Sequence, residues 1–191
     1  MRLRELTTLA MLTAIAALLM QFVQFPIIPG APYLRFDPSE VPTLLAGVMF
    51  GPLAAVAVAL LKNVVRMLLF GSATGWIGPA ANFIAVGLFV GVASWVYWRR
   101  PTTGGLARGV ALGAVVRTAA MVPVLVFFIL PVFFNYSPTD WAAIQTRVLP
   151  LMGAAFVPFN LVTSVVNGAL TLWMVALLRD RIPTLRRADT A

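Results

Sequence analysis

Long apolar runs, interrupted by very few charges, decide the structural class of this sequence. Hydrophobic residues make up 61% of the 191 residues and charged residues only 10%, against about 45–50% and about 25% in soluble domains. A soluble core could not hide so much apolar surface, whereas a bilayer accepts one helix for about every 20 apolar residues. The runs predict an all-α integral membrane protein, a single domain over residues 1–191, with six transmembrane helices in one bundle at about 6–25, 41–50, 53–70, 79–98, 106–134 and 149–178.

Prolines and glycines predict the shape of the connections between these helices. The stretch 25–40 holds four prolines and one glycine, so it cannot be a regular helix. Because it is also rich in apolar residues, we expect it to fold back onto the protein as a lid or to skim the membrane. The fifth run is long and contains Pro123 and Pro131, which predicts a tilt or a kink. Residues 135–147 read as a polar loop, and the sixth helix is expected to bend near Pro158.

Basic residues set the expected orientation in the membrane. With the N-terminus inside, the inner loops and tails hold nine arginines and the outer loops only Arg35 and Arg147. This bias follows the positive-inside rule and places both termini and the 99–108 loop in the cytoplasm, in a multi-pass membrane protein. The net charge of +8 is therefore a topology signal, and no nucleic-acid partner is expected. The nine inner arginines are Arg2, Arg4, Arg99, Arg100, Arg108, Arg179, Arg181, Arg186 and Arg187.

Several kinds of chemistry lack the residues that they need. The chain has no Cys and no His, which removes thiol nucleophiles, imidazole bases and the usual zinc ligands. Its six acidic residues do not pair on any predicted helical face. We therefore expect no metal site, no cofactor and no enzymatic activity.

Polar residues inside the predicted spans are the strongest functional clues, because each costs free energy in lipid. The third span carries Lys62, Asn63 and Arg66, and the fourth carries Asn82. Lys62 and Arg66 lie one turn apart and could instead extend toward the outer headgroups. Arg117 lies in the middle of the fifth span, and no carboxylate is predicted at its depth.

The sixth span carries a polar stripe on one helical face. The spacing predicts that this face is turned toward other helices or a cavity. Either the side chains hydrogen-bond between helices, or the outer end of the stripe lines a solute site. The stripe consists of Asn160, Thr163, Ser164, Asn167 and Thr171.

Small residues line one side of the first span at Ala10, Ala14 and Ala17. Such spacing lets another helix approach closely. The partner helix could belong to the same bundle or to another subunit.

Five short motifs, taken in order, resemble a known family. They are Leu34–Pro42 (LRFDPSEVP), Ala46–Ala54 (AGVMFGPLA), Leu60–Asn63 (LLKN), Phe70–Gly75 (FGSATG) and Ala81–Phe83 (ANF). The chain resembles the substrate-binding S components of energy-coupling factor (ECF) vitamin transporters, and within these the riboflavin-binding RibU family. The resemblance covers about residues 8–90 closely and continues at Ile129–Pro131 and Pro158–Leu161.

The resemblance implies a capture subunit of an ECF-type ABC importer for ATP-driven riboflavin uptake. It implies a vitamin site near the outer face under the first loop, a separate transmembrane coupling subunit and two ABC ATPases. It also implies that the Ala10–Ala14 face of helix one docks on the coupling subunit. The candidate ligand-binding residues are Tyr33, Leu34 and Phe36 for an apolar slot, Trp76 at its mouth, and Lys62, Asn63, Asn82, Arg117, Asn160, Thr163 and Asn167 as polar groups.

Two positions depart from the RibU pattern. That family commonly has a lysine three residues after the Pro-Phe-Asn asparagine, where this chain has Thr163. A family asparagine late in helix five is replaced by an apolar residue near 125–126. These departures keep open an alternative solute, either another vitamin or a small heterocycle. Less favoured alternatives are a ligand-free membrane scaffold and an intramembrane lipid enzyme.

Overall fold

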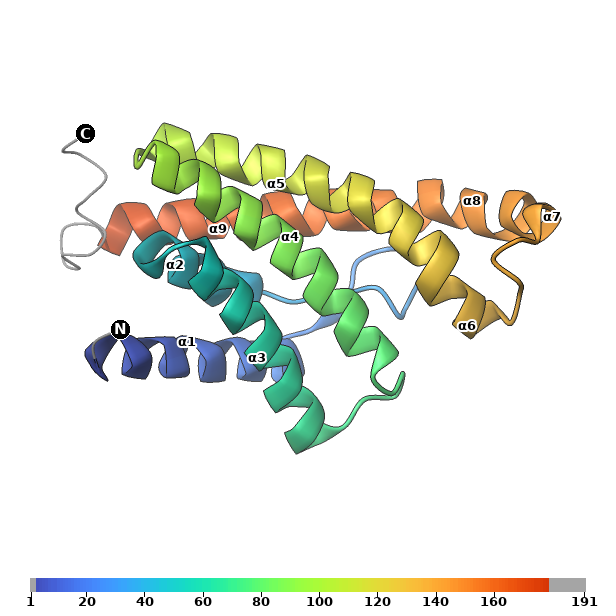
Figure 1. Cartoon of the computed structure of the whole chain (residues 1–191), viewed down its shortest axis with the longest axis horizontal. Coiled ribbons are helices and arrows are strands. Elements are labelled where there is room, and N and C mark those ends of the chain that lie inside the picture. The colour runs from blue at the N-terminus through green and yellow to red at the C-terminus, as the bar shows by residue number, and fades with distance from the viewer. Residues whose placement is uncertain (1–2, 179–191) are drawn as a thin grey trace.

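The computed structural model describes residues 3–178 as a helical bundle with one short hairpin (Figure 1). Five helical segments are long and apolar enough to cross a membrane, in agreement with the predicted membrane class. A shorter apolar helix, α2 (Glu40–Phe50), has 11 residues and spans about 16 Å. Of the nine arginines that set the expected orientation, Arg2, Arg179, Arg181, Arg186 and Arg187 lie outside the described residues, as do the two chain ends.

Three of the long segments are regular α-helices. They are α1 (Leu3–Phe22), α3 (Pro52–Phe70) and α4 (Ile77–Arg99). Helix α1 begins and ends about three residues earlier than expected. Its end is early because the chain leaves the helix before Pro26 and forms strand β1 (Phe25–Pro26). This strand pairs antiparallel with β2 (Arg35–Phe36).

The other two long segments combine α-helical and π-helical turns. The fifth consists of α5 (Thr103–Val124), η1 (Leu125–Ile129) and α6 (Leu130–Phe134). The sixth consists of α7 (Trp141–Ala143), η2 (Ile144–Val148), α8 (Leu149–Leu151), η3 (Met152–Phe156) and α9 (Val157–Leu178).

Each π-helical turn ends two residues before a proline. The turns η1, η2 and η3 precede Pro131, Pro150 and Pro158. A proline inside a helix has no N–H to donate, and its ring collides with the carbonyl four residues earlier. A widened turn relieves that collision, so the irregularity expected in the fifth and sixth helices takes the form of π-helical turns.

The predicted polar loop at residues 135–147 is wrong in its second half. Asp140 caps a helix there, because its Oδ1 accepts a hydrogen bond from the Ala143 N–H at 3.1 Å. Ile144 and Val148, one turn apart, are both buried. The sixth helical segment therefore starts at Trp141 and not near Leu149.

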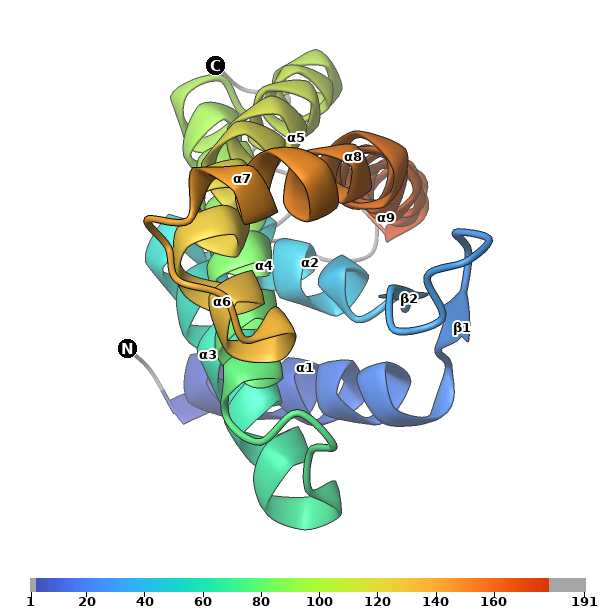
Figure 2. The same ribbon diagram turned by 90° about the vertical axis from the view of Figure 1, so that its right-hand side faces the viewer.

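Different connections lie at the two ends of the bundle. The start of α1, the α2–α3 junction, the α4–α5 turn and the end of α9 lie at one end, on the left of Figure 1. The hairpin, the α3–α4 loop and the α6–α7 loop lie toward the other end, and Figure 2 views the molecule from that side. Because the latter connections were predicted to be extracellular, we call this the outer end.

Two apolar cores fill the bundle. The inner one packs Leu44, Phe89 and Leu106 from α2, α4 and α5. The outer one contains Ala31 and Leu34 of the first loop, packed with residues of α5, η1, η2 and η3. Ala31 is 1% exposed. The first loop therefore folds back onto the bundle, as the lid prediction requires.

Candidate functional site

A buried ion pair lies at the centre of the bundle. Nη1 of Arg117, on α5, is 2.8 Å and 3.0 Å from the two carboxylate oxygens of Glu40, the first residue of α2. Nε of Arg117 donates to Oδ1 of Asn160, on α9, at 2.9 Å, and Nη1 also lies 3.4 Å from Oγ of Ser164. All four side chains are buried. One guanidinium thus joins three helices.

This ion pair corrects the expectation that Arg117 has no carboxylate at its depth. Glu40 was assigned to the first outer loop, but α2 begins at Glu40 inside the bundle. A sequence signal for this was present: Asp37-Pro38-Ser39-Glu40 places small polar residues and an acid at a helix start, where the free N–H groups favour them.

Lys62, on α3, is buried beside the same start of α2. Its Nζ donates to Oγ of Ser39 at 2.5 Å, and its exposed fraction is 0%. The alternative in which Lys62 extends to the outer headgroups is therefore wrong. On the same helix, Nδ2 of Asn63 donates to Oδ1 of Asn82 at 3.1 Å. Arg66, one turn further out, is half-buried.

The polar stripe of α9 faces the bundle interior, as predicted. Its five members are at most 5% exposed. Asn160 contacts Arg117, and Nδ2 of Asn167 donates to the backbone carbonyl of Asp37 at 3.2 Å. Thr163 and Thr171 bond to carbonyls of their own helix. Hydrogen bonding to another helix therefore involves the outer members Asn160 and Ser164, whereas the inner members bond to the first loop and to α9 itself.

The first loop brings aromatic residues to the outer end of α9. The Tyr33 ring lies 6.1 Å from the Phe156 ring, at an interplanar angle of 38°. Nδ2 of Asn160 donates to the Phe156 carbonyl at 2.9 Å, one turn away. Leu34 and Phe36 are buried, whereas Tyr33 is 55% exposed. Partial burial raises the pKa of the Tyr33 phenol. An aromatic face and an amide edge therefore adjoin at the outer end.

Other predicted residues lie apart from this arrangement. Trp76, just before α4, is 71% exposed at the outer end. Ala10 and Ala14 are exposed on α1, but Ala17 is 2% exposed and packs inside the bundle. Of the three small residues, Ala17 therefore packs within the same bundle, and Ala10 and Ala14 face outward.

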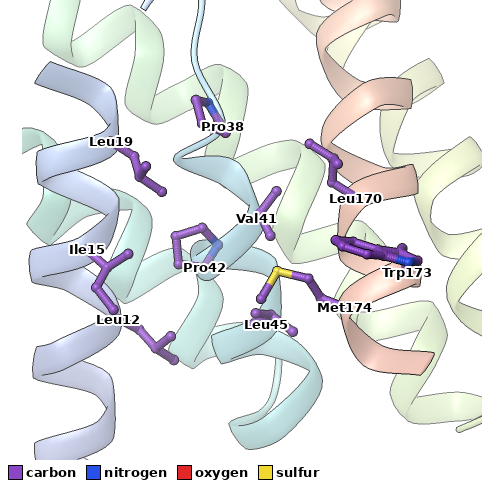
Figure 3. A pocket seen from close by; sticks show the side chains of 10 residues that line it. All are labelled: Leu12, Ile15, Leu19, Pro38, Val41, Pro42, Leu45, Leu170, Trp173 and Met174. Atoms are coloured by element: carbon purple, nitrogen blue, oxygen red, sulfur yellow. The ribbon is translucent and has the colours of Figure 1, made fainter. Parts of the chain in front are cut away.

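An apolar groove of about 270 Å³ runs between α1, α2 and α9 (Figure 3). Ile15 of α1 and Trp173 of α9 lie on opposite sides of it, and Pro42 and Val41 of α2 lie between them. No charged side chain lines it, so it cannot fix the polar edge of a heterocycle. Within residues 3–178, no group of three or more His, Cys, Asp or Glu residues could hold a metal ion.

Comparison with known proteins identifies the class of this fold. The family model of the ECF transporter substrate-specific component matches residues 4–176. The chain therefore belongs to the family of ECF transporter substrate-specific components.

Characterised relatives and a solved structure agree with this assignment. The chain is 36% identical to the riboflavin transporter FmnP of Bacillus subtilis over 171 residues, covering 87% of each protein. It is 35% identical to the riboflavin transporter RibU of Staphylococcus aureus, covering 85% of this chain and 84% of the relative. The solved S component of a bacterial ECF transporter superposes with a TM-score of 0.78 at 31% identity, over 93% of this chain and 96% of the other. The named relatives are transporters rather than enzymes.

Proposed function

We propose that this protein captures riboflavin at the outer face of the bacterial plasma membrane, as the solute-binding subunit of an ATP-driven ECF importer. The likeness to riboflavin transporters over 87% of both chains carries the proposal. The arrangement of Tyr33, Phe156 and Asn160 supports it, because a flavin needs a flat apolar surface and polar groups at its edge.

The polar groups near the slot suit a ring edge that alternates carbonyl and N–H groups. Asn160 uses one lone pair for Arg117 and one N–H for the Phe156 carbonyl, so its amide retains one further acceptor and one further donor site. Within the described chain, no hydrogen bond engages Nη2 of Arg117, which leaves a donor beside Asn160. We propose that this guanidinium supplies the positive charge that the family lysine supplies at the position of Thr163. Lys62, Asn63, Asn82 and Asn167 remain candidate ligand groups.

Titration of the purified protein with riboflavin tests the proposal. We expect saturable quenching of flavin fluorescence at micromolar riboflavin or below. Thiamine, which lacks the tricyclic ring, should not compete. Absence of binding at micromolar riboflavin would contradict the vitamin assignment. Mass spectrometry of small molecules released from the purified protein would then identify the alternative vitamin or heterocycle.

We also propose that the end of the bundle opposite the first loop faces the cytoplasm. Arg99 and Arg108 flank the α4–α5 turn at that end, where the positive-inside rule places basic residues. The start of α1 lies at the same end (Figure 1). The chain must assemble with a coupling subunit and two ABC ATPases to use ATP, because it contains no Walker motif.

The exposed Ala10–Ala14 face of α1 is the proposed contact with the coupling subunit. Ala10→Leu or Ala14→Leu adds bulk to a face that is exposed in the isolated chain. We expect riboflavin uptake by cells to fall at least about tenfold, and the affinity of the purified protein for riboflavin to stay within about twofold. Ala111→Leu, which adds the same bulk at an exposed position of α5, is the control for a general effect of a larger side chain. Lost binding in Ala14→Leu would show instead that this face supports the solute site.

A further inference from the structure

The turn formed by residues 37–40 is held from three helices at once. From α3, Lys62 donates to Oγ of Ser39. From α9, Asn167 donates to the carbonyl of Asp37. From α5, Arg117 donates to the carboxylate of Glu40 at 2.8 Å. Each helix of this group reaches the same four-residue turn through one polar side chain.

The turn is also closed internally. The N–H of Ser39 donates to Oδ1 of Asp37 at 2.9 Å, and Thr43 Oγ1 donates to the carbonyl of Ser39 at 2.8 Å. Ser39 and Thr43 are both 0% exposed. The turn is therefore closed by its own hydrogen bonds, is buried at Ser39 and Glu40, and has polar links in three directions.

Packing alone does not require these groups. A buried ion pair often contributes no more stability than apolar side chains of the same volume. In a membrane protein, where apolar side chains are the default interior, two buried cations around one turn are costly. Because three polar contacts meet at one turn, we infer that they fix the position of this turn.

The turn is the end of the first loop. Strand β2 (Arg35–Phe36) directly precedes it and pairs with β1, so both stems of the loop are tied together next to the turn. Beyond the stems, Ala31 and Leu34 lie against the outer core. A displacement of the turn would therefore displace the whole loop.

We propose that residues 37–40 anchor the first loop, and that Arg117, Lys62 and Asn167 are positioning residues that keep this loop seated over the solute site. The role of the loop as a cover rests on the proposed function. The seating itself does not, because it can be measured without a solute.

A single cysteine can report the seating, because the natural chain has none. Ala31→Cys places a thiol on the inner side of the loop, at a position that is 1% exposed because the loop packs against the outer core. Its rate of labelling by a membrane-impermeant maleimide, in purified detergent-solubilised protein, measures how often the loop lifts. Pro32→Cys, at the exposed neighbouring position, gives the labelling rate of an uncovered thiol in every background.

The decisive experiment measures both labelling rates in the double variant Glu40→Leu/Arg117→Met, which we call the first background. It replaces both charges with apolar side chains of similar length, so the bundle should stay folded. We expect labelling at position 31 to accelerate at least about tenfold, with labelling at position 32 unchanged. Trp98→Phe is the matched control, because it removes an interhelical hydrogen bond of 2.9 Å to the Gly47 carbonyl, far from the loop. That control should leave labelling at position 31 unchanged.

A second background, with a single substitution, keeps the test informative if the double variant does not fold. Lys62→Met removes the bond to Ser39 and the basic group beside the turn but leaves the ion pair of Arg117 and Glu40 in place, and we expect labelling at position 31 to accelerate about threefold or more. If folded protein of both backgrounds labels at position 31 at the natural rate, the proposal is overturned and the polar groups serve packing alone. If the natural protein binds no riboflavin while both backgrounds release the loop, the proposed function fails and the anchor is supported.

Discussion

Glu40→Gln is expected to lower the free energy of unfolding by about 3–5 kcal/mol, because it leaves the buried charge of Arg117 without a counter-ion. The amide keeps the shape of the side chain and can accept one hydrogen bond, so the loss is mainly electrostatic. Lys62, a second basic side chain, is buried nearby and also interacts electrostatically with Glu40. Thermal unfolding in detergent should show a decrease of the midpoint on the order of 10 °C.

Asp140→Asn is the matched control for Glu40→Gln. It makes the same change from carboxylate to amide at an exposed helix cap, and asparagine caps helices as well as aspartate does. We expect its midpoint to change by no more than about 2 °C. An equally small change in Glu40→Gln would contradict the interpretation that the ion pair is desolvated.

Asn160→Leu is expected to weaken riboflavin binding about 5–150-fold. It keeps a similar volume but removes a donor and an acceptor from the proposed flavin edge. A buried polar group of the ligand left without a partner costs about 1–3 kcal/mol. The substitution also releases Nε of Arg117 from its partner, which disturbs the neighbouring donor. Titration by quenching of flavin fluorescence measures the change.

Thr171→Val separates this effect from general damage to the stripe. Thr171 lies on the same buried face, three turns deeper, and bonds only to the Asn167 carbonyl among the described residues. We expect its affinity to stay within about twofold of the natural protein. If Asn160→Leu lowers the unfolding temperature but its folded fraction binds riboflavin normally, Asn160 is a structural residue and not a ligand.

The positions of most helices could be predicted from the sequence, because hydropathy is a local property of the chain. Apolar runs located the spans, and Gly51-Pro52 separates α2 from α3 in the structure. The start at Trp141 was missed because residues 135–147 are polar in composition. The cap residue Asp140 and the buried pair Ile144 and Val148 carried the helical signal there.

The site was harder to predict because its contacts join residues that are distant in the chain. Arg117 and Asn160 were each recognised as costly in lipid, and both are buried as expected. The carboxylate that compensates Arg117 lies 77 positions earlier, at a helix start that reads as a loop end. Ser39, the partner of Lys62, was missed because a lone serine gives no signal of its own.

The prolines that follow the widened turns have a consequence for how related chains can differ in length. A π-helical turn holds one residue more than the α-helical turn that it replaces, so losing or gaining one residue there leaves a continuous helix. In both long irregular segments, only the part beyond the turn would rotate, while Arg117 and Asn160 would keep their orientation. Insertions and deletions of one residue at these turns therefore offer a route by which homologues could reshape the outer wall above an unchanged polar centre.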